Sequence, residues 1–121
     1  MSQLENSLSL FSTDFFRDND VDVVVHCAAL GVTKNSTDKE IVEPNIRIFL
    51  NLISCREHFK KMIILGSGSE YDKSREIRSI KEAEFGDSIP NDQYGFFKYV
   101  CSKVVENMDD DIVCIRLFGV F

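Results

Sequence analysis

Three short apolar runs, widely separated along the chain, restrict this sequence to few folds. They cover residues 21–29, 62–65 and 112–118. Their β-branched residues favour strands that are buried on both faces of a parallel sheet. Parallel strands need long crossover connections, and the segments between these runs carry helical patterns. The predicted fold class is therefore α/β, with a parallel sheet ordered β-α-β-α-β and flanked by helices.

The two segments between the strands each carry signals for where a helix begins. Thr37 and Glu40 form a capping box before the first helix, and Pro44 predicts that a short helix breaks there and a longer one restarts. Asp92 can cap a second helix that begins near Tyr94 and runs to residue 107 or 108. The core stripe of the first helix is Ile46, Phe49, Leu50 and Ile53, and that of the second is Phe97, Val100, Cys101, Val104, Val105 and Met108.

The remaining segments divide the chain into a lead-in and one domain. Residues 1–20 form the lead-in, with a short helix over residues 14–17 that Ser12 or Thr13 could cap. Residues 21–121 form the domain. Within it, residues 70–93 are charged and irregular, and a loop of that length is usually functional or disordered.

Composition excludes several classes of protein. The net charge is −6 with no basic stripe, which gives a nucleic acid nothing to bind. No apolar run approaches 18 residues and the N-terminus is no signal peptide, so we expect a soluble cytoplasmic protein without a membrane partner. The cysteines (Cys27, Cys55, Cys101 and Cys114) form no C-x-x-C pair, which predicts buried free thiols and no metal site.

The pair Tyr94 and Lys98 is the strongest candidate for chemistry. Residues four apart share one face of a helix, and here that face lies on the flank of the apolar stripe. A phenol beside an ammonium suits proton transfer, because the positive charge favours the phenolate. The alternative is an ordinary amphipathic helix with an exposed tyrosine and lysine. Ligands of such sheets bind outside the carboxyl ends of the strands, where Tyr94 and residues 27–29, 66–68 and 118–119 fall.

Several landmarks in order resemble the extended short-chain dehydrogenase/reductases, the NAD-dependent nucleotide-sugar epimerase/dehydratase group. These landmarks are residues 22–29, Asn45, residues 63–71, the Tyr-x-x-x-Lys motif at 94–98 and residues 116–121. The resemblance covers about residues 21–121 and implies the second half of an NAD(P)-binding Rossmann-like domain. It also implies NAD or NADP as cofactor and a nucleotide-sugar as partner.

The same resemblance implies roles for individual residues. Tyr94 would be the catalytic acid and base, Lys98 would bind the nicotinamide ribose, and Ser67 would hydrogen-bond the reacting oxygen, with Ser69 as the rival. The implied cofactor-binding residues are Ala28, Ala29, Asn45, Tyr94 and Lys98. The alternative for Ser67 is a polar residue that caps the end of a strand. The alternative for Asn45 is a residue at the start of a helix.

The sequence also departs from the family pattern. It has no glycine before Gly31 and so no Gly-rich phosphate loop, and Gly119 stands where many members carry asparagine. Tyr71 occupies the third glycine position of the only Gly-x-Gly segment. Without a strand beside residues 21–29, that run becomes an exposed sheet edge. We therefore expect that the chain forms a homodimer, binds a complementary fragment or is only marginally stable. A monodisperse, thermally robust monomer in light scattering would contradict this expectation.

Two functions from different classes follow. The chain resembles the catalytic half of an NAD-dependent epimerase, dehydratase or reductase, which moves a hydride at a sugar carbon while Tyr94 carries the proton. The isolated chain is expected to be inactive. Alternatively, the chain is a truncated non-catalytic remnant or an interaction module that pairs through its open sheet edge. A flavodoxin-like or response-regulator-like domain would need an acidic cluster or a phosphate loop at the strand ends, and the sequence shows neither.

Overall fold

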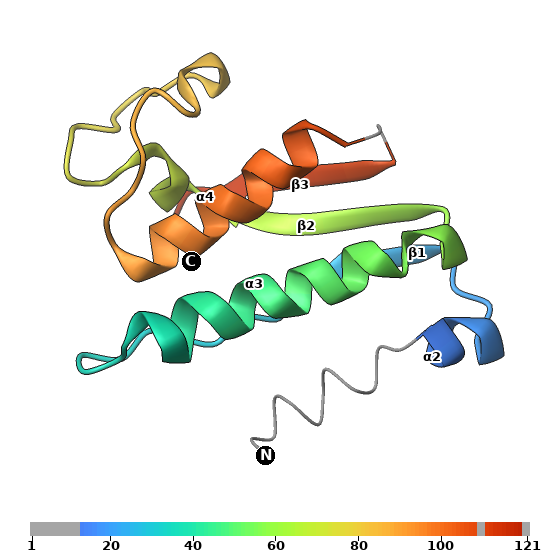
Figure 1. Ribbon diagram of the computed structural model, residues 1–121. Coiled ribbons are helices and arrows are strands. Elements are labelled where there is room, and N and C mark those ends of the chain that lie inside the picture. Colours follow the sequence, from blue (N-terminus) through green and yellow to red (C-terminus); the bar gives the residue numbers. More distant parts are fainter. Residues whose placement is uncertain (1–12, 109–110, 120–121) are drawn as a thin grey trace.

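Three parallel strands form a single sheet in the order β1-β2-β3 (Figure 1). The computed structural model describes residues 13–108 and 111–119. The strands are β1 (Val23–His26), β2 (Lys61–Ser67) and β3 (Ile112–Leu117). In their register, β2 pairs in parallel with β1 on one side and with β3 on the other. The predicted α/β class and parallel sheet are confirmed.

Two long helices cover one face of this sheet. They are α3 (Asp38–Ser54) and α4 (Gln93–Glu106), which lie side by side in front of the strands in Figure 1. Strand order follows chain order, so two crossovers of the same hand place both helices on the same face. The remaining elements are α2 (Thr13–Asp18) and the 3-10 turns η1 (Arg56–His58), η2 (Gly68–Tyr71) and η3 (Glu82–Glu84).

The core lies between the two helices and the sheet. Phe49 of α3 and Met62 of β2 are both completely buried there. The core cluster comprises Phe16, Phe49, Leu52, Ile53, Cys55, Met62, Ile64, Cys101, Val105 and Ile112. Helices α3 and α4 and strand β2 are therefore anchored in one hydrophobic cluster.

The other face of the sheet is open, which corrects the expectation of strands buried on both faces. Large apolar side chains of the outer two strands are exposed there: Val23, Val25, Val113, Ile115 and Leu117. No helix among the described residues covers this face, because both crossovers lie on the opposite one. β1 is an edge strand, as the missing neighbour predicts. Cys27 is exposed rather than buried, because it follows the end of this edge strand.

Two boundary predictions are wrong for identifiable reasons. Pro44 does not break the first helix, since α3 continues through it. Pro44 removes one backbone donor, but Ile41 and Asn45 on either side are buried and hold both parts of the helix in place. The second strand does not stop at Gly66 but continues through Ser67, because both residues pair with β3.

The predicted helix signals are otherwise confirmed. The Glu40 carboxylate accepts a hydrogen bond from the Thr37 backbone at 2.8 Å, as a capping box requires. The Asp92 carboxylate accepts from the Gly95 backbone at 2.9 Å and so caps α4. The short helix predicted at residues 14–17 is α2. The predicted lead-in over residues 1–11 and the Ser12 cap lie outside the described residues.

Candidate active site

The first two turns of α4 bring Tyr94 and Lys98 together, as their spacing predicts. The Tyr94 ring packs edge-on against Phe97 with ring centroids 5.3 Å apart. The Lys98 ammonium lies 5.8 Å from the centre of the Tyr94 ring, and both side chains are half-buried. Among the residues that the structure describes, none hydrogen-bonds to the Tyr94 hydroxyl, so this group is free to exchange a proton with a ligand.

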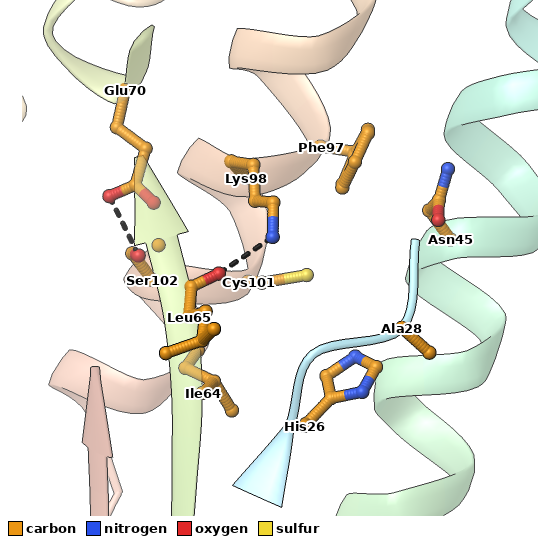
Figure 2. Close-up of a pocket in the computed structure, with 11 residues that line it drawn as sticks. His26, Ala28, Asn45, Ile64, Leu65, Glu70, Phe97, Lys98, Cys101 and Ser102 are labelled. Atoms are coloured by element: carbon orange, nitrogen blue, oxygen red, sulfur yellow. Dashed lines mark hydrogen bonds between the residues drawn. The ribbon is translucent and has the colours of Figure 1, made fainter. Parts of the chain in front are cut away.

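Lys98 is fixed by the sheet rather than by another side chain. Its Nζ donates a hydrogen bond to the Leu65 carbonyl at 2.6 Å, as Figure 2 shows. Leu65 lies near the carboxyl end of β2. An ammonium has three N–H donors, so two remain for a ligand.

Ser67 and Ser69 form the turn that leaves β2. The Ser67 Oγ accepts a hydrogen bond from the Ser69 backbone at 3.1 Å and so caps η2. This is the structural alternative that the sequence left open, yet it uses only an acceptor site of the hydroxyl. The Ser67 O–H can still donate to another oxygen.

Asn45 lies inside α3, buried at 3% exposure, so it is not the helix-start residue that the sequence left as an alternative. Its Oδ1 accepts from the Leu30 backbone at 2.8 Å, and its Nδ2 donates to the Ile41 carbonyl at 2.7 Å. Asn45 therefore holds the loop that leaves β1. Within that loop Ala28 and Ala29 are both exposed.

A small hollow lies beneath these residues, between the two helices and the sheet (Figure 2). Its volume of about 10 Å³ leaves room for about one water molecule. The lining residues are His26, Ala28, Asn45, Ile64, Leu65, Gly66, Glu70, Phe97, Lys98, Cys101 and Ser102. Neither Ala29, Ser67 nor Tyr94 lines it. The hollow is too small to hold a ligand larger than water. Such a ligand would have to bind outside the hollow, next to Tyr94 and Ser67.

His26 is a site residue that sequence reasoning missed. It ends β1 and its ring faces the hollow (Figure 2). Burial, together with the positive charge of Lys98, lowers the pKa of His26 to about 4. The signal in the sequence was a titratable residue within an apolar run. His26 is therefore neutral at pH 7 and adds no second charge beside Lys98.

Acidification is expected to destabilise the fold through His26. The unfolded chain takes up this proton near the ordinary pKa of about 6.5, whereas the folded chain does not until about pH 4. Stability is therefore lost as the pH falls from about 6.5 to 4, by at most about 1.4 kcal/mol per pH unit. Urea unfolding at pH 7, 6 and 5 measures this loss.

The matched variants are His26→Gln and His58→Gln, since the second removes an exposed histidine at the far end of the sheet. His26→Gln should reduce the loss of stability on acidification, whereas His58→Gln should show the same loss as the parent chain. Equal pH dependence in the parent chain and His26→Gln would contradict the assignment.

Beside the hollow, the buried Glu70 forms an ion pair with the partly buried Arg116, which sequence reasoning also missed. The Arg116 Nε donates to the Glu70 Oε2 at 2.7 Å, and the Glu70 side chain is completely buried. The Arg116 guanidinium also lies 3.8 Å from the centre of the Phe85 ring. The available signal was an arginine within an apolar strand, because such a residue needs a partner.

Other kinds of site are not visible in the described parts of the chain. No group of three His, Cys, Asp or Glu side chains within residues 13–108 and 111–119 could hold a metal ion. None of the four cysteines, all of which lie within the described residues, forms a disulfide bond. Across the same residues, no helix combines the length and apolar character needed to span a membrane.

Several solved structures share this fold. A GDP-mannoheptose C4 reductase from Campylobacter jejuni with NADP bound superimposes with a TM-score of 0.73 at 16% identity, over 93% of this chain and 40% of that one. The Bordetella bronchiseptica enzyme WbmG, in complex with NAD and UDP, gives 0.67 at 19% identity, over 90% and 34%. A GDP-L-fucose synthetase from Naegleria fowleri bound to NADP gives 0.63 at 20% identity, over 90% and 38%.

The chain thus spans two fifths or less of the length of these structures. At such low identity they establish the Rossmann-like fold alone. No curated protein sequence matches. The model of one protein family, the NAD dependent epimerase/dehydratase family, matches residues 9–121. The chain therefore belongs to the NAD dependent epimerase/dehydratase family.

Proposed function

We propose that this chain carries the proton-transfer half of an NAD(P)-dependent nucleotide-sugar epimerase, dehydratase or reductase. The observation that supports this most is the arrangement of Tyr94 and Lys98. A phenol hydroxyl with no hydrogen-bond partner among the described residues lies one helical turn from an ammonium that the Leu65 carbonyl fixes at 2.6 Å. Both groups stand at the carboxyl ends of the strands, where ligands of parallel sheets bind.

In the proposed reaction each residue has one task. When bound, NAD(P) supplies the hydride donor or acceptor for a sugar carbon. Tyr94 exchanges a proton between its phenol oxygen and the sugar hydroxyl on that carbon. The Ser67 O–H donates a hydrogen bond to the same sugar oxygen, with Ser69 as the alternative donor. Lys98 uses its two remaining N–H groups to hold the nicotinamide ribose.

The residues present fit one end of the cofactor. Ala28 and Ala29 are small and exposed beside the hollow, which lets a ring approach the backbone, and Asn45 holds their loop. For the pyrophosphate, the described residues include no Gly-rich turn that leads from a strand into a helix. We propose that this chain contacts the nicotinamide ribose. The lack of a disulfide among the four cysteines, all within the described residues, supports a cytoplasmic location as part of the same proposal.

Cofactor titration tests the proposal. Purified chain, shown to be folded by circular dichroism, is titrated with NADH and separately with NADPH while cofactor fluorescence is followed. We expect saturable binding, with the Kd raised about tenfold or more in Lys98→Met, a loss of about 1.4 kcal/mol. Lys103→Met is the matched control on the same helix, because Lys103 pairs with Glu106 outside the site. Its Kd should stay unchanged.

A second function is favoured by the open face of the sheet. Parallel sheets are covered by helices on both faces, and here one face exposes Val25 on the edge strand β1 and Ile115 and Leu117 on the opposite edge strand β3. The fitting partner is a segment that adds a strand parallel to β1 and lays helices on this face. A folded chain that binds neither cofactor would contradict the enzymatic proposal and leave this interaction module as the better one.

A further inference from the structure

The Glu70 carboxylate joins three separate elements. Its Oε1 accepts a hydrogen bond from the Ser67 backbone at 3.0 Å, and its Oε2 accepts from the Ser102 hydroxyl at 2.8 Å. The same Oε2 accepts from the Arg116 Nε at 2.7 Å. The exit of β2, helix α4 and strand β3 therefore meet at one completely buried side chain.

Two of these donors, Ser67 and Ser102, are connected to the proposed catalytic groups. Ser102 lies one turn after Lys98 on α4, and it is 1% exposed. Ser67 carries the hydroxyl proposed to contact the sugar. The Glu70 contacts thus connect the turn that holds Ser67 with the helix that holds Tyr94 and Lys98.

The backbone around Glu70 is shaped to admit its carboxylate. A Cβ atom on Gly66 would lie 2.6 Å from the Glu70 Oε1 and 2.7 Å from the Cys114 Sγ, both too close. Glycine at this position therefore leaves the space that the carboxylate fills. Arg116 compensates the buried charge, since one partner alone would leave an uncompensated charge in the interior.

We infer that Glu70 is a positioning residue of the proposed active site. Its hydrogen bonds fix the position of Ser67 relative to Tyr94 and Lys98. This inference rests on the proposed function for the identity of the site. It assigns Glu70 no contact with substrate or cofactor. The competing explanation is a structural ion pair with Arg116 whose contact with Ser67 has no separate effect.

Two double variants separate these explanations. Glu70→Gln/Arg116→Met removes both charges, while the glutamine can still accept from the Ser67 backbone and donate to the Ser102 hydroxyl. Glu70→Met/Arg116→Met also removes both charges but offers neither hydrogen bond. Neither variant leaves a charge unpaired, and replacing a buried ion pair with side chains of similar volume is often neutral for stability. The two chains differ only at position 70.

Amide hydrogen exchange measured by NMR is the first readout, and it needs no ligand. We expect the Ser67 amide to exchange about tenfold or more faster in the Met/Met chain than in the Gln/Met chain. The Ile64 amide, in the middle of β2, should exchange equally in both. The second readout is the NADH titration, in which the Met/Met chain should bind about tenfold more weakly and the Gln/Met chain like the parent.

Equal Ser67 exchange in the two chains would overturn the inference, as would a change that affects Ser67 and Ile64 alike. If the Met/Met chain does not fold, the Gln/Met chain alone decides: retained Ser67 protection supports the inference and lost protection overturns it. Failure of the parent chain to bind NADH would contradict the proposed function. Ser67 exchange would still decide the role of Glu70.

Discussion

Replacing Phe49 with alanine is expected to lower the free energy of unfolding by about 3–5 kcal/mol. The Phe49 side chain is 0% exposed and belongs to the core cluster between α3, α4 and the sheet. Alanine would lose the apolar burial and leave a cavity that the surrounding elements fill only in part. Domains of this size have total stabilities of about 5–15 kcal/mol, so the variant should be close to unfolding. Urea denaturation followed by circular dichroism measures the change.

The next residue supplies the control. Leu50 lies on the same helix but is 47% exposed, so its predicted place in the core stripe is wrong. Leu50→Ala should therefore change the free energy of unfolding by less than about 1 kcal/mol. Similar losses at both positions would show that α3 does not pack against the sheet through the face that carries Phe49.

Gly95→Ala is expected to destabilise the chain by about 1–3 kcal/mol, although alanine favours a helix over glycine by about 1 kcal/mol. A Cβ atom at this position would lie 2.7 Å from the Ser69 carbonyl oxygen and 2.9 Å from the Pro90 Cβ. The first of these contacts is with backbone, which cannot move aside as the end of a flexible side chain can. The variant should therefore push the first turn of α4, with Tyr94, away from the turn after β2.

Gly31→Ala is the matched control for this variant. No heavy atom lies within 4 Å of a Cβ atom built on Gly31. At such a position alanine reduces the conformational entropy of the unfolded chain and is neutral or stabilises the fold by about 0.4–1 kcal/mol. Thermal or urea unfolding compares the two. A gain in stability from Gly95→Ala would mean that helix propensity outweighs the contact with Ser69.

The features that could be predicted from the sequence are those that depend on residues close together in the chain or on the lengths of the connections between strands. The capping residues Thr37 and Asp92 fixed where α3 and α4 begin, because a cap acts over three or four positions. Tyr94 and Lys98 were placed together correctly for the same reason, since one helical turn separates them. The parallel order of the strands followed from the length of their connections.

What could not be predicted depends on contacts between distant parts of the chain. Glu70 and Arg116 are 46 positions apart, and no local pattern shows that they pair. Pro44 was expected to end a helix, but burial on both sides of it outweighed the loss of one hydrogen bond. The apolar runs were correctly assigned to strands, yet which faces are covered depends on which elements accompany the sheet.

The hydrogen bond from Lys98 to the Leu65 carbonyl has a consequence for mutational scanning of this chain. Every amino acid carries a main-chain carbonyl, so no single codon change at position 65 can delete the acceptor that orients the lysine. A scan of side-chain substitutions would detect a loss on replacing Lys98 but no loss that reports its acceptor, the Leu65 carbonyl. Tolerance at position 65 would then reflect how the Leu65 side chain packs, while the acceptor for Lys98 stays in the backbone of β2 whatever the side chain.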